Sequence, residues 1–494
     1  MKLKAKWMGF VLAGAGLSGC GALLGLDEFT EGTGGSGTST GTIWSKQFGE
    51  AATAEDLAVA PDGSILVSGV FATSINFGPT PTTMLTLAIN NVAFFLAKLA
   101  PDGSHLWSKA LIQKGDSNVF SRVAVASDGQ IFLSGIYEDA IDIDGQMLSA
   151  SAGNQLSFFV ASFDKDGKRL WAKSFGFSSK AVMSDLAVDP DGDPVIVGEY
   201  ANGAIVFDGA TYSSPVGKNA FVAKLAHSDG SVAWSNSYGA DMSDQSAMAV
   251  AVDSAGNIVV AGTTNAFIDF GSVPSNFPSG GGLDVFVVQL GSNGTPVWHT
   301  SFHGPNDEMV SSVAVDSLGD VYVAGAFSGV TQFEAQDIPT SKSTTGATDT
   351  DFFLVKMNAK GAHAWIKQLG DSKPQIPQSP FFALPALPRV SLDSKGDVLF
   401  AGGFLGSLQL GTTPLTSLGD SDWFIGKLTS SGDHLWSKSF GDSAPAQFVT
   451  SISSDPKTDA VVLGGVNDGS LAIGPGAPLK AKGTLSVVVA KLNP

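Results

Sequence analysis

The sequence predicts an all-β fold class, and three observations lead to it. The strongly hydrophobic runs are short, rich in Val, Ile and Phe, and bounded by Gly turns, which is typical of strands. Few of these runs alternate cleanly, and residues 284–290, for example, are almost wholly apolar, which indicates burial on both faces of a sheet. No stretch beyond the first twenty residues has a convincing helical period.

Tryptophan marks an internal repeat. Seven Trp residues lie in strand-like runs at spacings of 63, 64, 63, 64, 67 and 71 residues, which is too regular for chance. Each unit carries four strand-like runs, and the Trp run is the last of the four. The anchors are Trp44, Trp107, Trp171, Trp234, Trp298, Trp365 and Trp436.

The two ends of the chain complement each other. The first Trp strand, Thr42–Phe48, has no repeat strand before it, whereas the last apolar strand, residues 485–492, has no Trp strand after it. The sequence thus contains seven first strands and seven third strands, but only six Trp strands lie between consecutive units, and Trp44 supplies the seventh. We predict a seven-bladed β-propeller of four-stranded blades, closed by the N-terminal strand pairing into the last blade.

The turns alternate in length along each unit. First-to-second connections such as residues 60–63 and 189–192 are tight and end in Gly, which supplies the left-handed residue of the turn. Third-to-fourth connections such as residues 100–103 are tight as well, whereas the other two connections are longer and vary. Because the strands run up and down, all tight turns lie on one face and all variable connections on the other. We expect recognition on the variable face.

The N-terminal residues predict where in the cell the protein is located. Lys2, Lys4 and Lys6 precede a short apolar run, and residues 1–19 have the form of a secretory signal peptide. The segment Leu-Ser-Gly-Cys at residues 17–20 looks like a bacterial lipobox, which implies cleavage before Cys20 and its lipidation. Residues 20–41 then form a Gly/Ser/Thr tether and residues 42–494 the propeller. We expect anchoring in the membrane through Cys20, at the outer membrane or cell surface of the bacterial envelope.

Composition limits the partners. The chain has 46 acidic residues against 28 Lys plus Arg, a net charge of −18, which opposes binding to nucleic acid. Cys20 is the single cysteine, so no disulfide within the chain is expected. No cofactor is expected beyond the weak calcium binding considered below.

The repeat has a recognisable consensus. It reads Trp-x-Lys-x-Phe-Gly, then Val-Ala-Val-Asp-x-x-Gly, then Val-x-Gly, then Phe-Val-Ala-Lys-Leu, and this resembles the SBBP-type bacterial β-propeller repeat over residues 42–494. The resemblance implies a propeller on a secreted or surface lipoprotein and carries no catalytic residues with it. The third-strand Lys is replaced by Ser162 and Gln289 in two units, which favours a structural role for that lysine column.

Acidic residues recur where the fourth strand leads into the next unit. One interpretation is loop capping and solvated charge; the other is a ring of carboxylates at the channel mouth that attracts calcium weakly or a basic partner. The Asp189–Asp193 segment also resembles the start of a calcium loop, but it lacks the later Glu, and we expect a plain turn. The recurring acids are Asp56, Asp116, Asp185, Asp244, Asp307, Asp371 and Asp442.

One insertion breaks the period, at residues 370–389. It is rich in Pro and offers Phe381 and Phe382 for apolar contact, either as a plug over the channel or as a partner-binding loop. The candidate binding face is therefore this loop together with the recurring acids. The leading functional hypothesis is a non-catalytic, lipid-anchored scaffold for a protein or glycan. There are two alternatives: an extracytoplasmic hydrolase or lyase with its site at the channel mouth, and a purely structural envelope component.

Overall fold

The chain is almost entirely strand and turn in the part that the structure, a computed structural model, describes. The one helical segment among these residues is a 3-10 turn at Pro81–Thr83, and no helix there is long and apolar enough to cross a membrane. The all-β prediction is confirmed. The described residues are 41–87, 92–114, 120–150, 156–177, 180–239, 243–271, 281–333, 336–339, 350–371, 375–376, 387–443, 447–474, 477–481, 483 and 485–494.

A four-stranded antiparallel unit recurs, and we name each unit by its first strand. In the β2 unit, β2 (Ala52–Val59) pairs with β3 (Ile65–Phe71), β3 with β6 (Ala93–Leu99), and β6 with β7 (His105–Lys114). The tight turn after β2 is closed by the N–H of Gly63, which donates to the carbonyl of Ala60 at 2.8 Å, and Gly63 has a φ of 85°.

The same order of strands repeats along the chain. The further units are β8 (Ser121–Val125), β9 (Ile131–Tyr137), β12 (Ser157–Phe163) and β13 (Arg169–Phe177); β14 (Lys180–Val188), β15 (Pro194–Phe207), β16 (Ala210–Leu225) and β17 (Val232–Tyr238); β18 (Gln245–Val252), β19 (Ile258–Thr264), β20 (Asp284–Leu290) and β21 (Pro296–His303); β22 (Glu308–Val315), β23 (Val321–Ser328), β26 (Thr350–Met357) and β27 (His363–Leu369); and β28 (Arg389–Leu392), β29 (Val398–Phe404), β32 (Asp422–Leu428) and β33 (His434–Phe440).

The β34 unit combines both ends of the chain. It contains β34 (Gln447–Ser454), β35 (Val461–Asn467) and β38 (Ser486–Leu492), and its fourth strand is β1 (Thr42–Phe48). In the antiparallel β1–β38 pair, Lys46 lies opposite Val489. The N-terminal and C-terminal strands therefore share one sheet.

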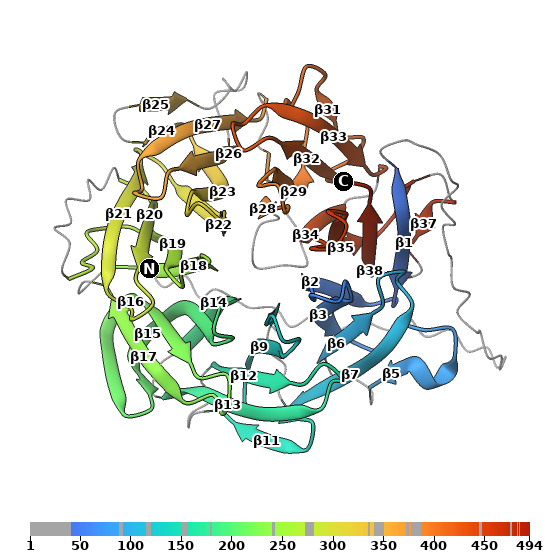
Figure 1. Cartoon of the computed structure of the whole chain (residues 1–494), viewed down its shortest axis with the longest axis horizontal. Coiled ribbons are helices and arrows are strands. Elements are labelled where there is room, and N and C mark those ends of the chain that lie inside the picture. Colours follow the sequence, from blue (N-terminus) through green and yellow to red (C-terminus); the bar gives the residue numbers. More distant parts are fainter. Residues whose placement is uncertain are drawn as a thin grey trace, which may run out of the picture.

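The units are arranged around a common axis in a propeller-like way (Figure 1). First strands lie nearest the centre and Trp-bearing fourth strands at the periphery. Each first strand contacts the first strand of the next unit, from β2 to β8 and onward to β28 and β34, and β34 contacts β2. The innermost strands thus surround the axis.

The core lies between the faces of adjacent units. All side chains of β6 are buried, and Phe94 on this strand packs edge-on against Phe159 of the β8 unit with ring centroids 5.6 Å apart. Phe158 stacks in turn on Phe221 of the β14 unit at 5.4 Å. Burial on both faces explains why these strands are apolar throughout instead of alternating.

A tryptophan–turn contact links six of the seven described fourth strands to the following unit. The indole Nε1 of Trp44 donates to the carbonyl of Pro101 at 3.0 Å, in the third-to-fourth turn of the β2 unit. Gly103 of that turn has a φ of 79°, and a Cβ there would lie 3.1 Å from the Trp44 ring. Both the left-handed backbone and the close indole therefore favour glycine at this position. The other contacts of this kind are Trp107 to Lys165, Trp171 to His227, Trp234 to Ser292, Trp298 to Ala359, and Trp365 to Ser430.

Several second-to-third connections form a small hairpin of their own. β10 pairs with β7, and β24 with β21, so these hairpins extend the outer edge of the preceding unit. The sequence predicts only variable loops here, because the paired segments are two to four residues long. The hairpins are β4 (Ser74–Asn76) with β5 (Met84–Thr86), β10 (Ala140–Ile143) with β11 (Gln146–Ser149), β24 (Val330–Phe333) with β25 (Gln336–Pro339), β30 (Ser407–Leu408) with β31 (Leu415–Thr416), and β36 (Ser470–Leu471) with β37 (Leu479–Lys480).

Candidate functional site

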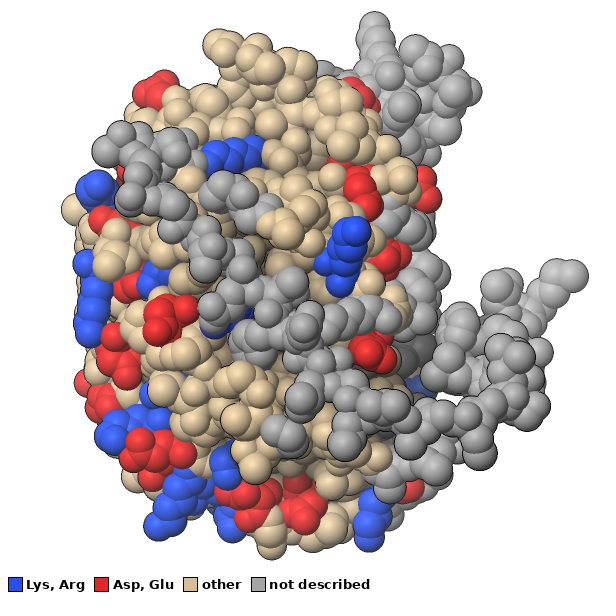
Figure 2. Space-filling model, turned by 90° about the vertical axis from the view of Figure 1, so that its right-hand side faces the viewer, with Lys and Arg blue, Asp and Glu red and all other residues tan. Residues whose placement is uncertain are grey.

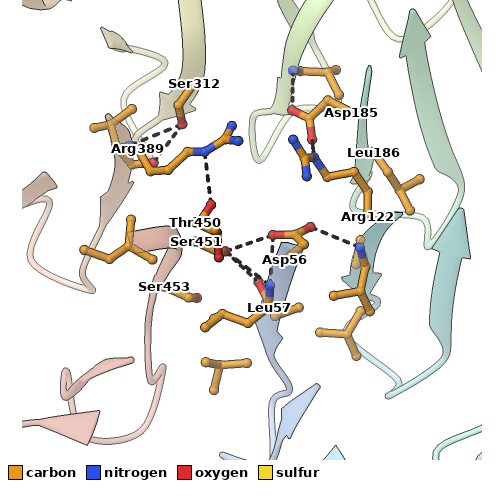
Figure 3. A pocket seen from close by; sticks show the side chains of 18 residues that line it. Asp56, Leu57, Arg122, Asp185, Leu186, Ser312, Arg389, Thr450, Ser451 and Ser453 are labelled. Carbon is orange, nitrogen blue, oxygen red and sulfur yellow. Dashed lines mark hydrogen bonds and ion pairs between the residues drawn. The ribbon is translucent and has the colours of Figure 1, made fainter. Parts of the chain in front are cut away.

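The innermost strands line a cavity of about 330 Å³. Its walls are built from the half of each first strand that leads toward the tight turns, for example residues 56–59, 122–125 and 450–453 (Figure 3). The cavity is therefore the place where all units can contribute to one site. Its polar lining consists of Asp56, Arg122, Asp185, Ser312, Arg389, Thr450, Ser451 and Ser453.

One strand position supplies most of these polar groups. It lies four residues before the tight turn begins, and in most units the pairing register shifts just before it, at a β-bulge. We call the residues at this position the ring residues. They are Asp56, Arg122, Asp185, Ala249, Ser312, Arg389 and Ser451.

Ring residues of four units, the β2, β14, β22 and β34 units, accept a backbone N–H from the next unit. The acceptor is a side-chain oxygen, and the donor is the residue that follows the ring position in the next first strand. Each bond satisfies the backbone amide of a buried residue in a first strand. These bonds join Asp56 to Val123 at 3.0 Å, Asp185 to Val250 at 2.9 Å, Ser312 to Val390 at 3.2 Å, and Ser451 to Leu57 at 3.2 Å.

Asp56 is the most heavily engaged carboxylate of the ring. Its Oδ1 accepts the hydroxyl of Ser451 at 2.8 Å and the N–H of Leu57 at 2.9 Å, while Oδ2 accepts the N–H of Val123. The carboxylate thus joins the β34, β2 and β8 units at the axis. Its contacts are those of a structural link.

Asp185 and Arg122 form the charged pair of the cavity. The Nε of Arg122 lies 3.5 Å from Oδ1 of Asp185, and Nη1 donates to the carbonyls of Ser121 at 3.2 Å and Glu55 at 3.4 Å. Burial raises the pKa of Asp185 above its ordinary value, and the Arg122 charge only partly offsets this. Arg122 therefore compensates only part of the cost of burying the charged Asp185 carboxylate.

Arg389 is held by carbonyl groups only. Its Nε donates to Thr450 at 3.1 Å and its Nη1 to Ser311 at 2.6 Å. Burial first, and then the positive charge of Arg122, lower the pKa of Arg389 to about 10, against the raising effect of Asp185 and Asp56. Within the described part of the chain, no carboxylate lies within ion-pair distance of this guanidinium.

Glu55 lies beside the ring on the bulged residue of β2. Its Oε2 accepts the N–H of Ser121 at 2.6 Å and the Ser121 hydroxyl at 3.1 Å. Burial raises the pKa of Glu55 to about 8, against the lowering effect of the Ser121 bonds and of Arg122. Burial therefore outweighs the groups that favour the charged form of this carboxyl.

The structure places the sequence-predicted acids in two different settings. Asp56 and Asp185 line the cavity, but the others that it describes lie in connections between units, so the recurring acids do not form one ring. Their side chains cap loops there: Asp307 accepts the N–H of Leu283 at 3.0 Å, Asp371 the amide of Gln375 at 3.1 Å, and Asp442 that of Gln447 at 2.6 Å. Asp244 makes main-chain contacts with Asn265.

Four predicted residues lie outside the described part of the chain: Cys20, Asp116, Phe381 and Phe382. The choice between a plug and a partner loop for the insertion therefore stays a prediction. What the structure describes of the insertion is its anchor, because Gln375 and Ile376 are buried and Ile376 belongs to the hydrophobic core.

The Asp189–Asp193 segment is a turn whose carboxylates are taken by a lysine. Oδ1 of Asp189 accepts the N–H groups of Asp191 and Asp193, each at 2.9 Å, and the ammonium of Lys224 contacts both Asp189 and Asp193. Lysine occupies the place that a cation would need. Among the described residues, no group of three or more His, Cys, Asp or Glu side chains could hold a metal ion.

Sequence reasoning missed Arg122 and Arg389 because it looked for acids near the connections. The useful signal is the distance to the tight turn: counting four residues back from each turn selects the ring, including both arginines. The chain has three arginines in all, so two of them at one repeat position is a pattern that the sequence carries.

Comparison with known proteins gives limited information. No protein-family model matches the chain. An uncharacterized WD repeat-containing protein of Acanthamoeba polyphaga mimivirus is 23% identical over 353 residues, which cover 59% of this chain and 25% of the viral protein. The chain thus spans about a quarter of the length of this curated relative. A WD-repeat relative agrees with the propeller-like arrangement.

Solved structures give weak overall superpositions. BamB from Moraxella catarrhalis aligns with a TM-score of 0.36 and 11% identity, covering 84% of this chain and 95% of that chain. Quinohemoprotein alcohol dehydrogenase from Comamonas testosteroni aligns with a TM-score of 0.37 and 13% identity, covering 90% and 76%. None of these similarities assigns the chain to a family.

Proposed function

We propose that the chain is a closed, seven-bladed β-propeller, tethered to the bacterial cell envelope by a lipidated Cys20, and that it is a non-catalytic scaffold for a protein or glycan. The contacts between successive first strands and the sharing of the β34 unit between β1 and β38 support the closed ring. The tether of residues 20–41 would let the ring stand away from the lipid surface.

The observation that carries the scaffold function is the character of the second-to-third connections. They differ in each unit. Five of them, and the nearby part of β16 in the β14 unit, expose a large apolar side chain, which is the kind of group that anchors a partner. On the face seen in Figure 2, acidic and basic side chains are interspersed. No large patch of one charge on that face would therefore dominate the binding of a partner. The exposed residues are Met84, Met147, Val216, Phe267, Val330 and Leu418.

A matched pair of variants tests this function. In one, these six exposed residues become Ser; in the other, four exposed apolar residues of the fourth strands, Leu106, Leu170, Val297 and Leu435, become Ser. The full chain is immobilised and exposed to native envelope extract, and retained proteins and glycans are quantified. We expect the first variant to lose retention at least tenfold and the second to keep it. Equal retention by both would contradict the proposal.

A hydrolase or lyase is the second candidate, because Asp56 and Asp185 line the same cavity. Both carboxylates already accept backbone and side-chain donors, so use as a general base would break the links between units. Hydrolysis of a panel of nitrophenyl glycosides and esters by the full chain, abolished in Asp185→Asn, would establish this activity.

A further inference from the structure

The cavity has an excess of hydrogen-bond donors that nothing described in the chain takes up. Arg122 and Arg389 bring ten guanidinium N–H groups to one space, because each guanidinium carries five. Carbonyls and Asp185 engage only Nε and Nη1 of each, and in the described part of the chain neither Nη2 has a partner. Both side chains project into the cavity (Figure 3).

The acceptors of the cavity are, by contrast, already occupied. Asp56 accepts three hydrogen bonds from Ser451, Leu57 and Val123. Asp185 accepts the N–H of Val250 as well as the contact from Arg122. The groups of the cavity that still need a partner are therefore donors, which require oxygen lone pairs.

The choice of arginine supports a ligand role. The chain carries 28 Lys plus Arg, of which only three are Arg, and two of those three are ring residues. Lys would be an adequate counter-charge, but the planar fork of Arg matches carboxylate and phosphate oxygens in pairs. The like charges of Arg122 and Arg389 also act on each other, which an anion between them would relieve.

We propose that the central cavity is a binding site for a small oxyanion, a phosphate or a carboxylate, held between the guanidinium groups of Arg122 and Arg389. The volume of about 330 Å³ suits an ion or a single sugar acid and is too small for a polymer segment. Between the ring residues and the tight turns, the cavity is lined by the small side chains of Ala58, Ala124 and Ser453.

Thermal unfolding and titration calorimetry of the full chain test the site, with inorganic phosphate and glucuronate as separate probes and sodium chloride at matched ionic strength as the reference. We expect the unfolding midpoint to rise by about 2 °C for at least one probe at ten times its Kd, with one site per chain. Phosphate alone raising the midpoint would identify a phosphate site, and glucuronate alone a carboxylate site. No shift beyond chloride with either probe would overturn the proposal.

Variants separate this site from general ion effects. Arg389→Met keeps the aliphatic stem and removes the guanidinium, and it should abolish the probe-specific shift. Arg169→Met changes the one arginine outside the ring and should leave the shift unchanged. An equal shift in Arg389→Met would overturn the proposal; if that variant does not fold, wild-type calorimetry with no heat for either probe would overturn it equally. The outcome does not depend on the scaffold function proposed above.

Discussion

The junction between the β28 and β34 units is built differently from the other junctions. Elsewhere a fourth-strand Trp donates to the third-to-fourth turn of the next unit, as Trp365 does to Ser430 at 3.1 Å. The Trp436 of β33 faces the β34 unit, in which the third and fourth strands are the two ends of the chain and no such turn exists. Sharing one unit between the termini therefore removes one tryptophan–turn contact.

A different tryptophan crosses that junction. Trp423 of β32 is fully buried, and its Nε1 donates to the carbonyl of Val466 in the β34 unit at 3.1 Å. Glycine at 465 provides the room, since a Cβ there would lie 2.5 Å from the indole. The comparison teaches that a missing peripheral contact is compensated by a larger side chain in the core of the same junction.

The largest effect is expected from Trp423→Ala. Removing a buried indole leaves a cavity and an unpaired carbonyl, and should lower the free energy of unfolding by about 3–5 kcal/mol. Trp436→Ala, on the half-buried indole of the same junction, should cost much less. Urea unfolding monitored by circular dichroism compares the two variants. Equal losses of unfolding free energy would show that Trp423 does not compensate for the missing tryptophan–turn contact.

Junctions also differ in a buried acid, and this predicts a pH effect of Glu308→Gln. Glu308 is buried next to Asp284 between the β18 and β22 units, whereas the corresponding residue at the β28–β34 junction is Gln447. Burial first, and then the charge of Asp284, raise the pKa of Glu308 to about 8 from 4.5. The folded state therefore holds a proton that the unfolded state releases.

The sign follows from this difference in bound protons. Between about pH 4.5 and 8 Glu308 makes stability fall as pH rises, by at most about 1.4 kcal/mol per pH unit, and below pH 4.5 it has no effect. Glu308→Gln should remove that part of the slope and be more stable than wild type at pH 8. Unfolding free energies of both proteins at several pH values test it; parallel pH profiles would contradict the assignment.

A moderate effect is expected from Gly432→Ala. Gly432 has a φ of 87°, and a Cβ there would lie 3.2 Å from the Trp365 ring. Gly396 of the same unit has a φ of 79° and nothing within 4 Å of the same point, so it is a matched control for backbone strain alone. Both changes should cost about 1–2 kcal/mol for the left-handed backbone, and Gly432→Ala more than Gly396→Ala. Identical midpoints of thermal unfolding would show that the Trp contact is unimportant.

The smallest effect is expected from Trp365→Phe. The change removes the hydrogen bond to Ser430 and should cost about 1 kcal/mol beyond the loss of ring area. Trp436→Phe removes a similar half-buried indole that has no turn opposite it, and should cost less. A chemical-denaturation series on the two variants measures the difference between a junction with the contact and the junction without it.

The repeat made the strand order predictable from sequence. Trp anchors and Gly turns are separated by fixed distances, because the turn glycine must lie against the indole of the preceding unit, and this steric requirement leaves a visible period. The unpaired first Trp strand at Trp44 likewise indicates the β1–β38 pair that the structure shows. Local rules were sufficient for these features.

The site was less predictable, for a physical reason. The sequence prediction places Asp56 and Asp442 at the same junction between a fourth strand and the next unit, but Asp56 lies after the bulge inside β2 and Asp442 in the connection before β34. Both follow a Trp strand and come before the tight turn, which groups them, whereas the number of residues back from the tight turn separates them, since connection lengths vary and the strand length does not. The small hairpins were missed because segments such as Ser407–Leu408 are too short to show any period.

The most direct test of the closed ring is a cross-link between β1 and β38. Ser45 and Ala490 lie opposite each other in this pair, so with Cys20→Ser the double variant Ser45→Cys and Ala490→Cys should form a disulfide on oxidation. Peptide mapping by mass spectrometry detects it. The control places the second cysteine at Val489, whose side chain points to the opposite face. A disulfide in the first protein but not in the control is the predicted result, and its absence from both would contradict the closure of the ring.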